Sequence, residues 1–492
     1  MRDAVHRVDA PLYEDVWISG KRKLIWEAGK DVVIQTLLLM DARIKELEEQ
    51  FRLLNKKVVS LSRNSTNSSK PPSSDGPAVS RPKKKKSPRS AGGQVGHKGH
   101  KRELLHAETM DHIYDHYPCV CKRCAAFLDP QSCEETSEPE RYQTFELPKI
   151  KPLTTEHRCH ELECSCGYRT RAELPPEVAQ SQFGPRVHAA IGYLTSVHRI
   201  GRRGIVEILN TFFDLGLCLG TVCNCIDRVS SELVPVVEEA REALRTSSNL
   251  NIDETGWKCQ GQRRYLWVFV SSLVVYFSVA VSRGAKVLRS ILGETFQGVI
   301  TSDDHSAYSC YHKDGVRQLC WSHIIRKLKG LKESRSSPDA YLLAKYLLKE
   351  IGHIFECWHA LREGYIDRRQ LGNATVLMRA RMKGYCMRYR SSPDPQVRTR
   401  CKQMLHNWPH LFTFLTHEGV EPTNNSAERA IRPAVQWRKL CFGNQSEAGE
   451  CFTERILTVT RTCQLQGKNP FHFLSDLMHA ASHGLQRPSL LA

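Results

Sequence analysis

The chain has 492 residues, too many for one small core, and its 40% hydrophobic content is enough to bury the two to four structural units that we expect. The formal net charge is +18, from 71 Lys and Arg against 53 Asp and Glu, which favours a polyanion such as nucleic acid as partner and argues against an acid-rich, solvating chain. Residues 1–30 lack the apolar core of a secretory signal, so the 19 cysteines are expected to stay reduced in a cytosol rather than form a disulfide framework.

A regular apolar stripe follows this N-terminal segment, between residues 31 and 62. Its members recur at alternating spacings of four and three, and they are Val33, Leu37, Met40, Ile44, Leu47, Phe51, Leu54, Val58 and Leu61. This heptad pattern over four repeats predicts a coiled-coil helix, most simply in a dimer. An amphipathic helix packed on a domain is the alternative, but such a helix usually has a wider apolar face.

Residues 63–105 are rich in Ser, Pro, Gly and Lys and predict a flexible linker without a packed core. Nine Lys and Arg and no acid occur between Gly76 and Arg102, and four of them are consecutive: Lys83, Lys84, Lys85 and Lys86. We expect this basic arm to contact DNA, because each cation laid along a phosphate backbone releases a condensed counterion. A solvated linker or a nuclear-import signal is the alternative.

A cysteine-rich region at residues 106–175 predicts a small zinc-binding β module. Cys121 and Cys124 form one pair and Cys164 and Cys166 another, and 39 residues separate the two pairs. Four thiolates around a structural Zn²⁺ would supply the folding energy that so small a module lacks. The spacing departs from two C-x-x-C pairs, so Cys119 or Cys159 could replace one member, and unligated buried thiols are the alternative.

Helical patterns predominate from residue 176 to 247, and within them residues 202–233 hold two apolar-periodic segments around an Asp214–Gly216 turn. This pattern is consistent with a DNA-binding helix-turn-helix, and two ordinary packed helices explain it equally well.

Residues 248–335 predict strands that end in carboxylates. One apolar strand leads through Ile252 into Asp253, and another, at 298–303, ends in Asp303. Between them, residues 265–282 carry no charge, but their Val, Phe and Tyr content and the central Ser271-Ser272 favour a buried β-hairpin over a transmembrane helix. With a helix near 285–292, this order predicts a mixed α/β sheet whose strand-end acids converge.

A basic helix is expected at residues 320–331, followed by a helical insertion at 336–420. A third acid, Glu428, lies in the segment 421–445, and a helical segment at 446–492 ends the chain. Asn425 and Glu428 have the spacing of a capping box, which is the structural interpretation of this acid. The chemical interpretation is that Asp253, Asp303 and Glu428 hold two Mg²⁺ or Mn²⁺ ions at a phosphodiester. Arg429 and Arg432 would then meet phosphates.

These segments together resemble the transposase of the IS66 insertion-sequence family from about residue 31 onward. The motifs that carry the resemblance are NSSKPPSSD (67–75), GGQVGHKGH (92–100), the two cysteine pairs, NIDETGW (251–257), TSDDHSAY (301–308), CWSHIIRK (320–327), NNSAERAIRP (424–433) and LQGKNPFHFL (465–474). The resemblance implies a multidomain α+β protein with a leucine-zipper-like helix, a zinc-binding domain and an RNase H-like core of the DDE type. The implied catalytic, magnesium-binding residues are Asp253, Asp303 and Glu428.

The resemblance also settles smaller choices. An aspartate five residues before Tyr308 matches Asp303, so Asp304 is the weaker candidate, and Glu254 is expected on the opposite face of its strand. His323, Arg326 and Lys327 match the family's basic motif, with phosphate contact and helix packing both open as roles.

The implied reaction is Mg²⁺-dependent nicking at the ends of a mobile element and attack of the 3′-hydroxyl on target DNA. Its partners would be terminal inverted repeats, target DNA, a second copy of the chain and accessory proteins encoded by the element, in the bacterial cytoplasm at the nucleoid. A catalytically inactive DNA-binding regulator with the same coiled coil, zinc module and basic arm is the alternative.

Overall fold

The computed structural model describes residues 30–62, 64, 67, 102–175, 178, 181–313, 315–334 and 336–491. The described residues divide into two compact units. One takes residues from 1–79, 233–470 and 488–492, and the other from 80–232 and 471–487. The N-terminal segment 1–29 and the lysines of the basic arm, Lys83, Lys84, Lys85 and Lys86, lie outside the described residues.

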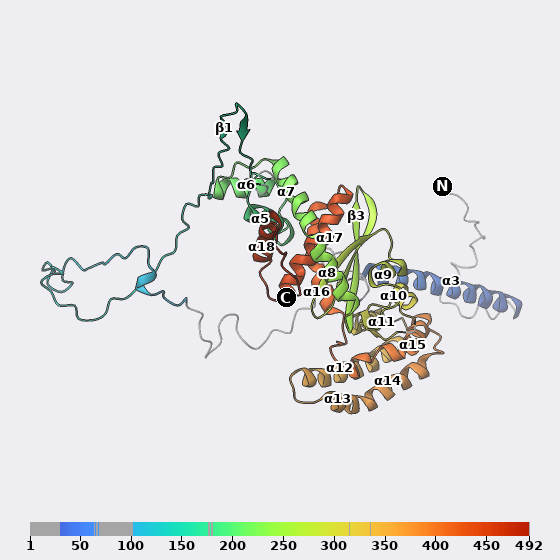
Figure 1. The fold of residues 1–492 in the computed structure, drawn as a ribbon. Helices are drawn as coiled ribbons and strands as arrows, with labels where there is room; N and C mark the ends of the chain where they lie inside the picture. Colours follow the sequence, from blue (N-terminus) through green and yellow to red (C-terminus); the bar gives the residue numbers. More distant parts are fainter. Residues whose placement is uncertain are drawn as a thin grey trace. The chain divides into compact units, whose positions relative to one another are not determined.

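A five-stranded mixed sheet forms the centre of the first unit (Figure 1). In spatial order its strands are β5 (Val275–Ala280), β4 (Gln262–Val270), β3 (Asn249–Cys259), β6 (Val299–Ser302) and β7 (Arg317–Leu319). Strands β5, β4 and β3 pair antiparallel, whereas β3, β6 and β7 pair parallel. The predicted hairpin at 265–282 is confirmed by β4 and β5. Among the described residues, no helix combines the length and apolar character of a membrane span.

Strand β3 is longer than the sequence pattern predicted. The prediction that its strand ends at Asp253 is wrong, because β3 pairs with β4 as far as Cys259 opposite Gln262. Gln260 and Gly261 form the turn between them, with φ angles of 51° and 76°, as the two-residue turn of a tight hairpin requires. Asp253 therefore lies in the interior of the central strand.

Helices cover both faces of this sheet (Figure 1). On one face α16 (Asn425–Cys441) packs on β3 and β4, where Ala427 and Ile431 join Trp257, Val268 and Phe277 in one apolar cluster. The other face carries Trp267, whose ring lies 6.2 Å from that of Tyr308. That tyrosine belongs to α10 (Ser306–Tyr311), which packs on α9 (Ala285–Leu292), and α8 (Val234–Arg245) packs on α9 and on β5.

The free edge of β5 is covered by α17 (Glu447–Leu465). Three side chains one helical turn apart accept the outward amides of the strand: Thr462 from Val275 (3.0 Å), Thr458 from Phe277 (2.9 Å) and Glu454 from Val279. Side chains thus replace the missing strand, and the edge has no unpaired amides at these three positions.

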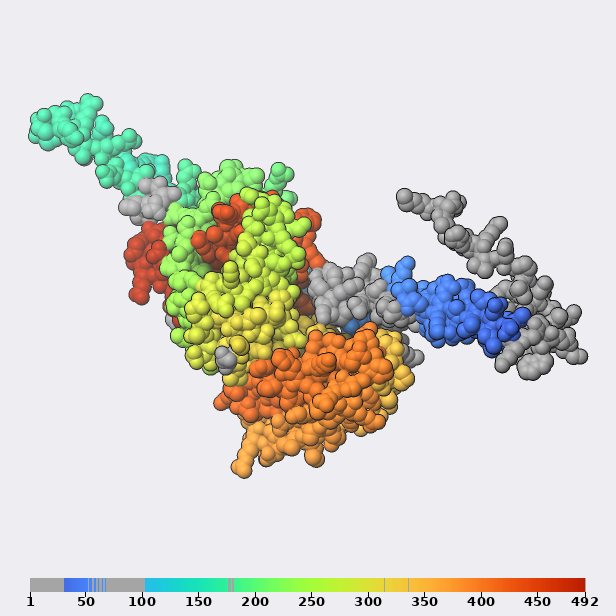
Figure 2. Space-filling view, turned by 90° about the vertical axis from the view of Figure 1, so that its right-hand side faces the viewer, coloured from blue at the N-terminus to red at the C-terminus, as the bar shows by residue number. Residues whose placement is uncertain are grey.

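The predicted helical insertion forms a lobe whose apolar core continues into the sheet at β6 and β7. It follows α11 (Trp321–Ser334) and consists of α12 (Pro338–Arg362), α13 (Arg368–Ala374), α14 (Val376–Tyr389), α15 (Pro395–His406) and two 3₁₀ turns, Trp408–His410 and Thr413–Leu415. Trp321, Leu347, Trp358, Met382 and Phe414 are buried together there. Figure 2 shows the lobe's surface in orange.

The second unit is built on α5 (Pro185–Ser196), α6 (Arg202–Phe213), α7 (Leu219–Glu232) and α18 (Pro470–Ser482), with a 3₁₀ turn at Ala107–Thr109 and a short hairpin of β1 (Glu161–Glu163) and β2 (Arg169–Arg171). Between α6 and α7, Asp214 and Gly216 take positive φ angles, and the side chain of Asn210 bonds both backbone groups of Leu217. The two helices and the turn of the predicted helix-turn-helix are therefore present, and DNA recognition by them stays a prediction. The C-terminal segment is shared between the units, with α17 in the first and α18 in the second.

Helix α3 (Lys30–Ser62) forms where the heptad stripe was found. Its stripe is exposed along most of its length, for example Leu47 at 48%, Phe51 at 66% and Leu61 at 79%.

Candidate active site

The sheet brings two of the predicted acids side by side. β3 and β6 are parallel neighbours with Asn251 opposite Thr301, and Asp253 and Asp303 each lie two residues further along their chains. Asp253 is on the face that α16 covers, because its strand partner is Val268 of the apolar cluster beneath that helix. Asp303 comes directly after the last residue of β6.

The third acid reaches the same place through a clamp at the start of α16. Asn424, 1% exposed, donates from its side-chain amide to the carbonyl oxygen of Ile252 (2.8 Å) and accepts from the side chain of Asn251 (3.0 Å). Glu428 follows in the first turn of the helix. The clamp therefore fixes the helix that bears Glu428 to the strand that bears Asp253.

The capping interpretation of Asn425 and Glu428 is wrong. The residue that precedes the helix is Asn424, and no side chain caps the helix start. The Glu428 carboxylate instead accepts from Arg326 of α11, with 3.2 Å between Nη2 and Oε1. It is thus turned toward α11 rather than back to its own helix.

Burial and mutual repulsion disfavour the charged forms of these acids. The pKa of Asp253 is raised well above its ordinary value, first by burial and then by the charges of Glu254, Asp303 and Glu428. Burial also raises the pKa of Glu428, against the opposing effect of Arg326. A bound divalent cation would remove this penalty, so the donor set fits hard cations such as Mg²⁺. The three acids do not form one tight group, since their oxygens are not all within 4.8 Å of one another. Two ions about 4 Å apart require such a spread of ligands.

Glu254 belongs to the opposite face of β3, as expected from strand alternation. Its side chain is 1% exposed and bonds both Arg283 and the hydroxyl of Tyr308. Arg283 also lies 3.9 Å from Asp303, so it links this buried acid to the candidate site. The local sequence patterns did not predict the roles of Arg283 and Tyr308, although the fixed spacing of Asp303 and Tyr308 was a usable signal.

Asp304 is directed toward the helical lobe. Its carboxylate accepts a hydrogen bond from the side chain of Asn407 (3.3 Å). Burial lowers the pKa values of Lys327 and Arg400, and the charge of Asp304 partly opposes this effect. This placement supports Asp303 as the acid of the candidate site.

The basic motif of α11 faces Glu428. Besides Arg326, His323 places Nδ1 3.8 Å from the same oxygen, and burial followed by the charge of Arg326 lowers the pKa of His323 to about 4. The imidazole is therefore neutral at physiological pH. Burial and the charge of Arg400 lower the pKa of Lys327, and the charges of Asp304 and Asp303 act in the opposite direction.

Arg429 and Arg432, the predicted phosphate contacts on α16, are exposed. Arg429 lines a cavity of about 630 Å³ whose other walls come from β3, the β4–β5 turn and α17, and include Asn251, Ser271 and Arg461. Both arginines are thus accessible to a ligand that approaches the start of α16.

The four predicted zinc ligands form two separate turns in the second unit. The amide of Ala125 bonds the carbonyl oxygen of Cys121, and that of Gly167 bonds Cys164 in the same way. The backbone amide of Cys124 is the main cause of a lowered pKa of the Cys121 thiol. The amide of Cys166 has the same effect on the Cys164 thiol. Within residues 102–175, no three His, Cys, Asp or Glu donors lie within 4.8 Å of one another, so the pairs are not assembled around a common centre. The zinc site stays a prediction.

Comparison with known proteins agrees with the resemblance found in the sequence. A family of unknown function matches residues 21–103. A curated relative, "Uncharacterized protein y4qI" of Sinorhizobium fredii (strain NBRC 101917 / NGR234), is 24% identical over 250 residues, which are 45% of this chain and 44% of that relative. The family model described as "Transposase IS66 family" matches residues 180–450, which are more than half of the 492 residues. This part of the chain contains β3, β6, α11 and α16. This chain belongs to the IS66 transposase family.

Proposed function

We propose that this chain is the transposase of an insertion sequence, which cuts the ends of the element and joins their 3′-hydroxyls to target DNA. Asp253, Asp303 and Glu428 would be its metal-binding catalytic residues. The observation that carries the proposal is the convergence of these acids from β3, the end of β6 and the start of α16, with the charges of Asp303 and Glu428 both acting on Asp253. The strand order, with an antiparallel hairpin on one side of β3 and two parallel strands on the other, supports an RNase H-like core.

The acids and the residues around them would have different roles in catalysis. Asp253, Asp303 and Glu428 would hold two Mg²⁺ or Mn²⁺ ions, which supply Lewis-acid stabilisation at phosphorus and activate the attacking oxygen. Asn424 fixes the helix of Glu428 to β3, and Arg283, paired with Glu254, lies behind Asp303. No covalent intermediate with the protein is needed, because the protein aligns the DNA and the acids.

The DNA would be held by cations on several segments. Arg326 and Lys327 of α11 lie near the acids, and Arg429 and Arg432 are exposed on α16. We propose these four residues, together with Lys83, Lys84, Lys85 and Lys86 of the basic arm, as phosphate contacts. Arg326 would exchange its bond to Glu428 for one to phosphate when metal binds.

Two further modules would serve assembly. The exposed stripe of α3 supports a coiled-coil dimer, because so long an apolar face is unfavourable in water. Cys121, Cys124, Cys164 and Cys166 would share one structural Zn²⁺, since each pair already sits in a turn whose amides favour thiolate. As a DNA-acting protein, the chain would work at the bacterial nucleoid.

The test compares Asp253→Asn, Asp303→Asn and Glu428→Gln with Asp304→Asn on pre-nicked and intact element ends, in Mg²⁺ and in Ca²⁺. We expect the first three variants to lose both end cleavage and strand transfer and to keep DNA binding, with Asp304→Asn remaining active. Cleavage by any of the three would contradict the assignment. Absence of cleavage by the unmodified protein, with DNA binding retained, would favour a catalytically inactive regulator.

A further inference from the structure

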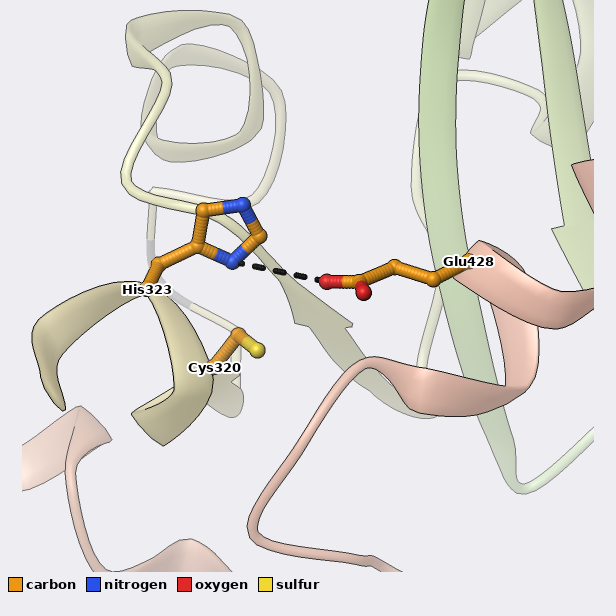
Figure 3. Close-up of side chains that lie close together, drawn as sticks. All are labelled: Cys320, His323 and Glu428. Atoms are coloured by element: carbon orange, nitrogen blue, oxygen red, sulfur yellow. Dashed lines mark ion pairs between the residues drawn. The ribbon is translucent and has the colours of Figure 1, made fainter. Parts of the chain in front are cut away.

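Three potential metal ligands of different chemistry meet beside the catalytic acids. Cys320 joins β7 to α11, His323 lies one turn further on, and Glu428 faces both from α16 (Figure 3). Their donor atoms all lie within 4.8 Å of one another, and His323 Nδ1 is 3.8 Å from Glu428 Oε1. No other three His, Cys, Asp or Glu donors among the described residues come so close together.

Each neutral donor is prepared for a ligand. The sulfur of Cys320, a residue 1% exposed, accepts from the backbone amide of Asn424 (3.1 Å). This bond favours a thiolate, but burial has the larger effect and raises the pKa of the thiol, so a bound metal ion would displace its proton. Nδ1 of His323 is buried, and no group among the described residues hydrogen-bonds to it. A buried ring nitrogen without a partner costs free energy, which a metal ion would recover.

The donor set determines which ion fits. Thiolate and imidazole favour Zn²⁺ and similar transition metals, whereas Mg²⁺ prefers oxygen alone. Tetrahedral Zn²⁺, with bonds of about 2.0–2.3 Å, holds its donors about 3.3–3.7 Å apart. The His323–Glu428 separation of 3.8 Å is close to that range, and all three donors lie within 4.8 Å of one another, so small movements would close the site.

The position of Glu428 gives such a site a consequence. Its carboxylate is within reach of Cys320 and His323, its charge also acts on Asp253, and Arg326 holds it with a single bond. Two cations so close together repel each other, and a Glu428 carboxylate turned to bind one of them is less able to bind the other.

We propose that Cys320, His323 and Glu428 bind Zn²⁺ or a similar thiophilic ion, and that this binding withdraws Glu428 from the Mg²⁺-dependent centre. The withdrawal of Glu428 rests on the proposed function, whereas the binding of the ion does not. Cys320 and His323 thus act as a regulatory metal site for the same glutamate. An inhibited, zinc-bound form and an active, magnesium-bound form exclude each other.

Binding is tested with Co²⁺ alone on the full-length protein, by the thiolate-to-cobalt charge-transfer absorption. We expect Cys320→Ser to bind one Co²⁺ fewer than the unmodified protein, and Cys310→Ser, which removes an exposed thiol of α10, to bind the same number. His323→Ala and Glu428→Gln should lose the same Co²⁺, which keeps the test decisive if Cys320→Ser fails to fold. Equal cobalt binding by folded Cys320→Ser or His323→Ala would overturn the proposal.

The consequence is tested by adding Zn²⁺ to Mg²⁺-dependent cleavage, with each variant normalised to its own zinc-free rate. We expect half-inhibition of His323→Ala to need at least about tenfold more Zn²⁺ than that of the unmodified protein or Cys310→Ser, because one of three protein ligands is lost. Equal inhibition of all three would overturn the exclusion between the two metals. Absence of any cleavage in Mg²⁺ would instead remove the proposed function, and the Co²⁺ result would still decide the site.

Discussion

The side-chain amide of Asn424 donates a 2.8 Å hydrogen bond to the backbone carbonyl of Ile252, the residue before Asp253. One buried residue thereby ties the start of α16 to the central strand, four positions before Glu428. A second bond from Asn251 and a third to the sulfur of Cys320 fix its orientation. The distance between two acids 175 positions apart in the sequence thus depends on this asparagine.

Replacing Asn424 by Ala should lower both stability and metal affinity. The substitution leaves the carbonyl of Ile252 without its side-chain donor, and we expect a loss of about 1–3 kcal/mol in the free energy of unfolding. Since Glu428 is then less well placed, half-maximal cleavage should need a higher Mg²⁺ concentration at temperatures where the variant is fully folded. Asn425→Ala, one residue further and less buried, is the matched control. An unchanged Mg²⁺ dependence in folded Asn424→Ala would show that the asparagine acts on stability alone.

Replacing Asp253 by Asn should stabilise the Mg²⁺-free protein while abolishing cleavage. The pKa of Asp253 is raised by burial and by neighbouring acids, so its contribution to stability is present at acid pH and is lost as pH rises through the raised pKa. The neutral amide avoids this loss, and we expect the Tm at pH 7.5 to rise by about 3 °C or more. Mg²⁺ should raise the Tm of the unmodified protein and not that of the variant.

Asp304→Asn supplies the matched contrast for that experiment. Asp304 is surrounded by Lys327, Arg400 and Asn407, so removal of its charge leaves partly buried cations uncompensated. Its Tm should fall where that of Asp253→Asn rises. Shifts of the same sign in both variants would contradict the electrostatic picture of the site.

Part of the sheet and site could be predicted from local patterns. The uncharged run at 265–282, rich in Val, Phe and Tyr, predicted the β4–β5 hairpin, and the apolar run before Asp303 predicted β6. The end of β3 could not be found in this way, because residues 254–258 mix charged, polar and aromatic side chains. Their extended form comes from pairing with β4, and Trp257 is buried by α16. Strand β7 has three residues, too few to show any period.

The contacts around the acids depend on tertiary structure that local patterns do not contain. Asn425 and Glu428 have the spacing of a capping box, yet Arg326, 102 positions away, supplies the partner of Glu428. In the same way, Glu254 pairs with Arg283 and accepts a hydrogen bond from the hydroxyl of Tyr308. The choice of metal ligands at Cys320 and His323 likewise required the position of α16.

The coiled-coil prediction is tested by placing a charge in the stripe of α3. Leu47→Asp puts a carboxylate at a core position of the heptad, where both copies would bring like charges together, so dimers should dissociate to monomers in light scattering after size exclusion. Glu48→Ala, at an exposed position beside it, should remain dimeric. A dimer that persists in Leu47→Asp would place the interface elsewhere.

The zinc prediction is tested by metal analysis of the purified chain. We expect about one Zn per chain at the cysteine pairs, lost in Cys121→Ser and in Cys164→Ser and retained in Cys218→Ser, which removes an exposed thiol outside them. A well-folded protein without zinc would remove this module from the proposal. Loss in only one of the two cysteine variants would point to Cys119 or Cys159 as the replacement ligand.

Glu454 should make the stability of the sheet edge depend on pH near neutrality. Burial raises its pKa from 4.5 to about 7, against the hydrogen bonds that it accepts from Val279 and Ser278. The folded state therefore binds this proton more tightly than the unfolded state. The resulting stabilisation is complete below pH 4.5 and is lost as pH rises through about 7.

Glu454→Gln keeps an acceptor for the β5 amide and removes the titration. We expect the variant to match the unmodified protein near pH 4.5 and to exceed it at pH 8 by on the order of 2–3 kcal/mol in the free energy of unfolding. Urea unfolding from pH 4.5 to 8 measures this difference. Glu447→Gln, at an exposed position of the same helix, should follow the unmodified protein throughout. Parallel pH curves for Glu454→Gln and the unmodified protein would mean that the carboxyl stays charged against the strand edge.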